Sequence, residues 1–125
     1  MILLTVDEII KLHSLLCAKT GGADGLRDRG LLESAVYSAE SSFGETEIYP
    51  TLFEKCARLC YALTSNHPFA DGNKRIGILV MLTILRLNGA GLKFTQEELI
   101  TLSLSLASGK LLYEDILNWI KLHTV

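Results

Sequence analysis

The sequence predicts an all-α fold, a compact helical bundle packed around one central buried helix at residues 73–87. Residues 76–87 form an almost unbroken apolar run. Elsewhere apolar residues recur at helical spacing between short polar loops, and no stretch carries a persuasive strand pattern. With 125 residues, of which 49% are hydrophobic, the chain can bury one core, and we expect residues 1–125 to form a single domain.

Composition narrows the range of partners and compartments. The net charge of −2 gives no electrostatic basis for binding nucleic acid. No apolar run is long enough for a membrane span, and the first residues lack the basic region of a signal peptide. Cys17, Cys56 and Cys60 have no metal-ligand spacing and fit a reducing cytoplasm, so we expect small core residues rather than a metal site or a disulfide.

Local signals place the first two helices. A capping box at residues 5–8 starts a helix with a regular apolar stripe, which Gly21 and Gly22 end. His13 lies on that stripe, and we expect it to pack rather than to act. A glycine- and charge-rich loop follows, and apolar spacing predicts a second helix over residues 31–39.

The remaining helices flank the central one. Pro50 suits the first turn of a third helix that ends at Asn66. After the central helix, the glycines at 89 and 91 form a stop. A second capping box at residues 95–98 opens a helix that ends at Gly109, and a last helix contains Trp119, which we expect to pack.

Candidate functional residues gather in segment 66–75, just before the central helix. Pro68 disfavours helix at His67, and Asp71 is a natural N-cap. The backbone N–H groups of Gly72, Asn73 and Lys74 then lack helical partners and favour an anion, as do the charges of Lys74 and Arg75. Each feature alone is ordinary, since Asp71 can be a plain cap and a histidine a surface residue. Together they predict a site for a phosphate chain, in which Asp71 is an oxygen ligand for Mg²⁺ and His67 is a titratable base at the rim.

Segment 66–75 closely resembles the Fic/Doc family signature H-x-F-x-(D/E)-G-N-x-R. The matching residues are His67, Phe69, Asp71, Gly72, Asn73 and Arg75, and Lys74 matches the variant of the death-on-curing (Doc-like) toxins. Residues 21–28 and 49–54 also resemble segments of those toxins, so that the similarity covers nearly the whole chain.

The resemblance implies the Fic fold, ATP with Mg²⁺ as the donor of the transferred group, and a role for each site residue. His67 is implied to be the general base on a protein hydroxyl, Asp71 the Mg²⁺ ligand and Arg75 the charge that offsets developing negative oxygen. Phe69 is expected to point inward and hold the loop to the core. Residues 40–49 have two interpretations, a plain surface loop or the family's target-binding flap, for which Phe43 and Ile48 are the candidate apolar anchors.

The resemblance leaves two reactions possible, transfer of a phosphoryl group and transfer of AMP. Members that transfer AMP typically have glycine at the position of Lys74 and a second arginine at the position of Ile78. This chain lacks both features and resembles Doc, which transfers the γ-phosphoryl group. Gly72, however, is the form found in AMP-transferring members, so we favour phosphorylation and keep AMP transfer (AMPylation) as the alternative.

The resemblance also implies a bacterial toxin–antitoxin setting. Doc-like toxins modify a translation factor, typically elongation factor Tu, and an antitoxin supplied in trans inhibits them. This sequence shows no inhibitory helix of the family's Ser/Thr-x-x-x-Glu-Gly/Asn pattern. A non-enzymatic module that binds a nucleotide or a helix is the rival interpretation. A metal-dependent hydrolase is disfavoured, because Asp71 is the one well-placed ligand.

Overall fold

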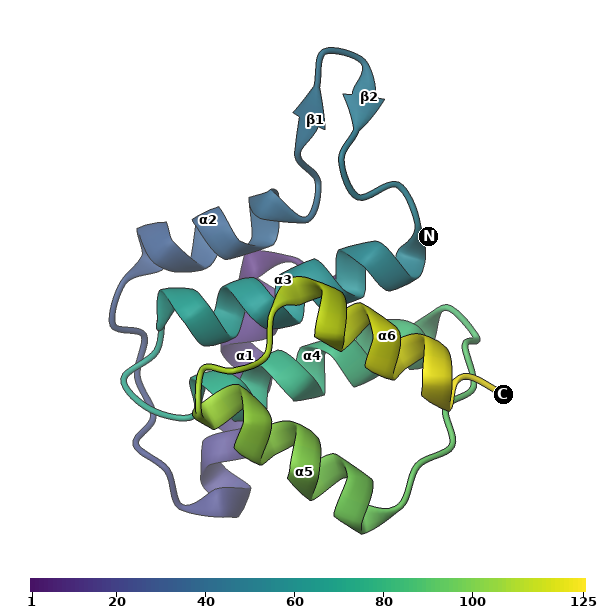
Figure 1. Ribbon diagram of the computed structural model, residues 1–125. Helices are drawn as coiled ribbons and strands as arrows, with labels where there is room; N and C mark the ends of the chain where they lie inside the picture. The colour runs from purple at the N-terminus through teal and green to yellow at the C-terminus, as the bar shows by residue number, and fades with distance from the viewer.

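The computed structural model describes residues 1–125 and is mostly helical, with one small antiparallel hairpin (Figure 1). The expected all-α bundle is confirmed. None of the helices is both long and apolar enough to cross a membrane. In chain order the elements are α1 (Val6–Thr20), α2 (Arg29–Ser38), β1 (Ser42–Phe43), β2 (Thr46–Glu47), α3 (Leu52–Asn66), α4 (Asn73–Leu87), α5 (Gln96–Ala107) and α6 (Tyr113–His123).

Helices α3 and α4 lie in the middle of the molecule, with the other helices around them (Figure 1). The core side chains of α4 are fully buried, as predicted for a central helix, and include Ile76, Val80, Met81, Ile84 and Leu85. Gly77 allows the two helices to approach closely, because a Cβ atom there would lie only 3.0 Å from the Cys60 carbonyl oxygen. The segment that joins α3 to α4 is therefore held at both ends by the best-packed part of the protein.

Threonine capping boxes fix the starts of three helices. Thr5, Thr51 and Thr95 each accept a hydrogen bond from the backbone three residues later, and the glutamate at that position caps in return. The boxes at Thr5 and Thr95 were predicted. The placement of Pro50 in the first turn of α3 was wrong, because Thr51 is the N-cap and leaves Pro50 outside the helix.

The hairpin occupies the segment that was expected to be a loop or a flap. It pairs Ser42 with Glu47 and Phe43 with Thr46, and it projects away from the helices (Figure 1). Its base is fixed by Lys55, a buried lysine of α3 whose Nζ donates to Ala39 O and to Glu47 Oε1, each at 3.2 Å.

The chain end is joined to α5 through His123. Its Nδ1 donates to Trp119 O at 2.7 Å and its Nε2 faces a carboxylate oxygen of Glu98. The hydrogen bond to Trp119, reinforced by Glu98, raises the pKa of His123 above its ordinary value of 6.5. Protonated His123 therefore stabilises the folded state. This contribution is complete below pH 6.5 and is lost as pH rises through the higher pKa of the folded state.

We expect the thermal midpoint of unfolding to fall as pH rises above 6.5 and through the raised pKa of His123, because His123 then loses its proton in the folded state. Differential scanning calorimetry of the wild type and His123→Gln checks this. The glutamine variant should lose part of the pH dependence, and an unchanged dependence would show that His123 does not cause it.

Candidate active site

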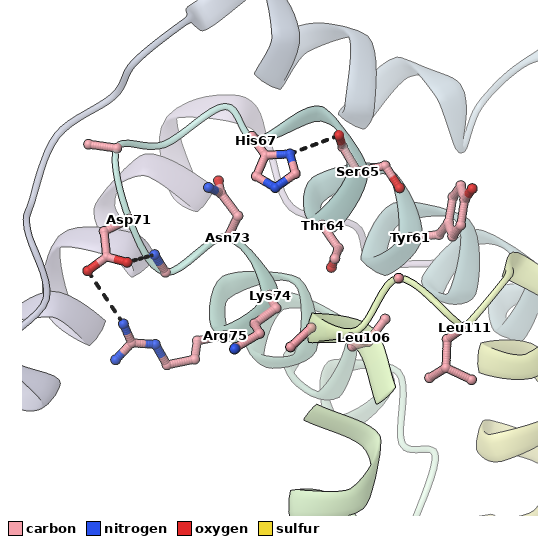
Figure 2. A pocket seen from close by; sticks show the side chains of 14 residues that line it. Tyr61, Thr64, Ser65, His67, Asp71, Asn73, Lys74, Arg75, Leu106 and Leu111 are labelled. Atoms are coloured by element: carbon pink, nitrogen blue, oxygen red, sulfur yellow. Dashed lines mark hydrogen bonds and ion pairs between the residues drawn. The ribbon is translucent and has the colours of Figure 1, made fainter. Parts of the chain in front are cut away.

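The α3–α4 segment and the end of α5 together line a cleft of about 610 Å³ (Figure 2). This volume is in the usual range for a small-molecule site. The segment supplies most of the polar side chains of the lining, whereas the side chains at the end of α5 and just beyond it are apolar. The lining residues are Tyr61, Thr64, Ser65, His67, Ala70, Asp71, Gly72, Asn73, Lys74, Arg75, Leu106, Ala107, Gly109 and Leu111.

His67 is an exposed residue at the end of α3 with one ring nitrogen occupied and the other free. It is the C-cap of the helix and has a left-handed backbone (φ 51°), which agrees with the predicted helix end before Pro68. Its Nδ1 lies 3.0 Å from Ser65 O, and because a carbonyl only accepts, Nδ1 carries the proton. Nε2 therefore keeps its lone pair, and this tautomer is the one a general base needs.

The loop that contains His67 is held by the loop between α1 and α2. Arg27 Nε donates to His67 O at 2.9 Å, and the backbone N–H groups of Arg27 and Asp28 donate to Pro68 O at 2.8 and 3.0 Å. Ala70 N donates to Gly25 O at 3.0 Å. These supporting contacts were not predicted. Their one signal in the sequence was the resemblance of residues 21–28 to death-on-curing toxins.

The prediction that Asp71 caps the central helix was wrong. Gly72 is the N-cap of α4, in a left-handed conformation (φ 76°), and no side chain caps it. Asp71 Oδ1 instead accepts a hydrogen bond from Gly72 N at 2.8 Å. The glycine turns the chain between Asp71 and the helix, so the carboxylate does not reach the N–H groups further along.

The predicted anion site shifts by one residue. Gly72 N is already engaged by Asp71, and the first helical bond of α4 runs from Ile76 N to Gly72 O at 2.9 Å. The N–H groups of Asn73, Lys74 and Arg75 have no hydrogen-bond partner. Three partnerless donors at the positive end of a helix favour an anion.

The Asn73 side chain holds the loop rather than facing the cleft as a ligand. Its Oδ1 accepts from Phe69 N at 2.9 Å and its Nδ2 donates to Phe69 O at 3.1 Å. The Phe69 side chain is 1% exposed, which confirms that it points inward. The ring of His13, itself 1% exposed, stacks on Phe69 with centroids 3.8 Å apart, and its Nε2 lies 2.7 Å from Asp71 O.

The two cations of the segment differ in their partners. Arg75 lies with one guanidinium nitrogen 3.7 Å from Asp71 Oδ2, whereas Lys74 lines the cleft and has no carboxylate partner. Figure 2 shows the Asp71–Arg75 pair at the left of the view and the His67–Ser65 contact at the top, with Lys74 below His67. The cleft therefore has one unpaired positive charge beside the free amides.

The other candidate residues lie away from this cleft. Phe43 and Ile48 are on the hairpin, 86% and 49% exposed, and do not line it. Cys56 and Cys60 are buried in the core, as expected, and burial raises the pKa of both thiols to about 12.

The helical fold agrees with a comparison of the chain with known families. The model of the Fic/DOC family matches residues 3–85, so the chain belongs to this family. It is 39% identical over 72 residues to Toxin Doc of Mycolicibacterium smegmatis, a match that covers 58% of this chain and 55% of that protein. It is 32% identical over 105 residues to Protein kinase doc of Escherichia phage P1, covering 84% of this chain and 82% of the phage protein.

Proposed function

We propose that the protein transfers the γ-phosphoryl group of ATP to a hydroxyl of a target protein. The observation that carries the proposal is His67, with Nδ1 held by Ser65 O and Nε2 free at the cleft that Lys74 and the amides of α4 also line. A base and an anion site in one cleft are the two parts that phosphoryl transfer requires. The relatives named Toxin Doc and Protein kinase doc support the same assignment.

Each residue has a proposed role. His67 Nε2 takes the proton of the attacking hydroxyl, and the free amides of Asn73, Lys74 and Arg75 hold phosphate oxygens. The Lys74 ammonium adds the charge that the amides lack, and Arg75 offsets negative charge that develops on oxygen.

The chain offers Mg²⁺ one carboxylate. Asp71 is half exposed, and its Oδ2 has only a long contact with Ala23 N, at 3.4 Å, and with Arg75. One carboxylate together with phosphate oxygens and waters is a common ligand set for this ion. Asp71 would hold the ion, which would supply positive charge that offsets the charge of the phosphates.

Phosphorylation is favoured over AMP transfer by the charges of the cleft. Ile78 is 6% exposed and packs in the core, so its position supplies no cation for a terminal phosphate. Lys74 is unpaired at the start of α4. Gly72 argues less strongly for AMP transfer than its identity suggests, because its left-handed backbone alone accounts for a glycine.

The proposed setting is that of a toxin. We propose a translation factor such as elongation factor Tu as the target and an antitoxin supplied in trans as the inhibitor. The exposed Phe43 and the half-exposed Ile48 suit the hairpin to bind a segment of the target.

Incubation with γ-labelled ATP, Mg²⁺ and a bacterial lysate tests the proposal. We expect one protein band to acquire label in the presence of the wild type and none in its absence. Nucleotide binding without any labelled band would favour the non-enzymatic alternative.

A further inference from the structure

We propose that His13, on α1, is a positioning residue that sets the geometry of the start of α4. The inference rests on the proposed function, because the group it positions is the anion site and its carboxylate. His13 does not line the cleft; it acts through the backbone of Asp71 and Gly72.

The geometry assigns the proton of the His13 ring. Its Nε2 lies 2.7 Å from the carbonyl oxygen of Asp71. Because this oxygen has no proton to donate, Nε2 is the donor. The ring is held on both sides, since Phe69 stacks on one face at 3.8 Å with an interplanar angle of 10° and Cys17 Sγ lies 3.6 Å from Nε2 and 3.8 Å from Nδ1. A buried ring with fixed neighbours gives a fixed donor.

The His13 Nε2–H group binds the backbone next to Gly72, a residue whose backbone is little restricted. The peptide bond between Asp71 and Gly72 is planar, so a fixed carbonyl of Asp71 also fixes the direction of Gly72 N–H. That N–H donates to Asp71 Oδ1 at 2.8 Å and so orients the carboxylate. Gly72 itself is left-handed, a conformation a glycine leaves easily. One hydrogen bond from His13 therefore controls both the carboxylate and the turn into the free amides.

A metal site on the same residues is less consistent with the geometry. His13, Cys17 and Asp24 bring one ligand atom each within 4.8 Å of one another. Cys17 Sγ, however, is almost equally far from both ring nitrogens. An atom sharing a metal on the Nδ1 lone pair would lie clearly farther from Nε2. Nδ1 instead faces the Asp24 carboxylate, whose Oδ1 is 3.7 Å away.

Two substitutions separate positioning from packing. His13→Phe keeps an aromatic ring against Phe69 but removes the donor, whereas His13→Gln loses the stacking and keeps an amide N–H at the position of Nε2. If His13 only packs, activity should follow stability, and the phenylalanine variant should be the more active. If His13 positions the Asp71 carbonyl, the glutamine variant should be the more active of the two.

We expect His13→Phe to lower kcat by about tenfold to a hundredfold, the usual cost of losing an orienting partner, with little change in KM for the target. His13→Gln should retain most of kcat despite a lower thermal midpoint. Wild-type kcat in the phenylalanine variant, or a larger loss in the glutamine variant, would overturn the proposal.

The exchange rate and chemical shift of the Gly72 amide give a readout that needs no transfer reaction. Faster exchange in His13→Phe than in His13→Gln supports positioning, and equal rates overturn it. Should the wild type transfer no group at all, the proposed function falls, while the Gly72 amide still decides whether His13 positions the turn.

Discussion

Replacement of His67 by alanine is expected to reduce transfer by about 10²–10⁴-fold, the usual cost of losing a positioned general base. The residue is exposed, so its truncation opens no cavity in the core. Its ring makes one hydrogen bond, to Ser65 O. The loss should therefore appear in kcat, measured with labelled ATP and target, while the thermal midpoint of unfolding changes little.

A second variant controls for the backbone of His67. The residue is left-handed, with φ 51°, and asparagine tolerates this conformation better than alanine does. His67→Asn should match the wild type in stability and the alanine variant in inactivity. Activity near the wild-type level in either folded variant would remove His67 from the role of base.

Substitution of Asp71 by asparagine is expected to weaken Mg²⁺-dependent ATP binding by about tenfold or more, because loss of a ligand should cost at least as much as loss of an outer-shell partner. Stability should change little. Asp71 is not the cap of α4, and its pairing with Arg75 is a partly exposed ion pair, a class that contributes about 0–1 kcal/mol. Titration calorimetry with ATP, in Mg²⁺ and in EDTA, measures the effect.

The matched control is Glu97→Gln, an exposed acid at the start of α5 that removes the same charge away from the cleft. It should leave ATP affinity unchanged in both buffers. If Asp71→Asn weakens binding equally with and without Mg²⁺, Asp71 is not the metal ligand, and its charge matters only through Arg75.

Features governed by neighbours in the sequence were predicted well. The bounds of α4 and the end of α3 follow from an apolar run and from Pro68, which act within a few residues. The cap of α4 was not predicted correctly. Aspartate is a preferred N-cap residue, but the left-handed backbone of Gly72 turns the Asp71 side chain away from the first turn of the helix. The N-cap preference of a residue type does not depend on the backbone conformation of the residue that follows it, so it could not predict this difference.

The contacts that hold the site in place could not be predicted from neighbouring residues in the sequence. His13 meets Asp71 and Arg27 meets His67 across 58 and 40 positions of sequence. A histidine on an apolar stripe predicts burial, and His13 is buried, but nothing in its spacing indicates which carbonyl it reaches. The buried Lys55 is similar, since its partners are Ala39, which precedes the hairpin, and Glu47, which lies in β2.

The central claim, transfer of the γ-phosphoryl group, is tested most directly by ATP labelled separately at the α and γ positions. Each label is followed in the purified target with the wild-type protein and Mg²⁺. Because Lys74 is the unpaired cation of the cleft and Ile78 is buried, we predict that the γ label enters the target and the α label stays in solution. Entry of the α label, with the γ label left in solution, would contradict the account and establish AMP transfer.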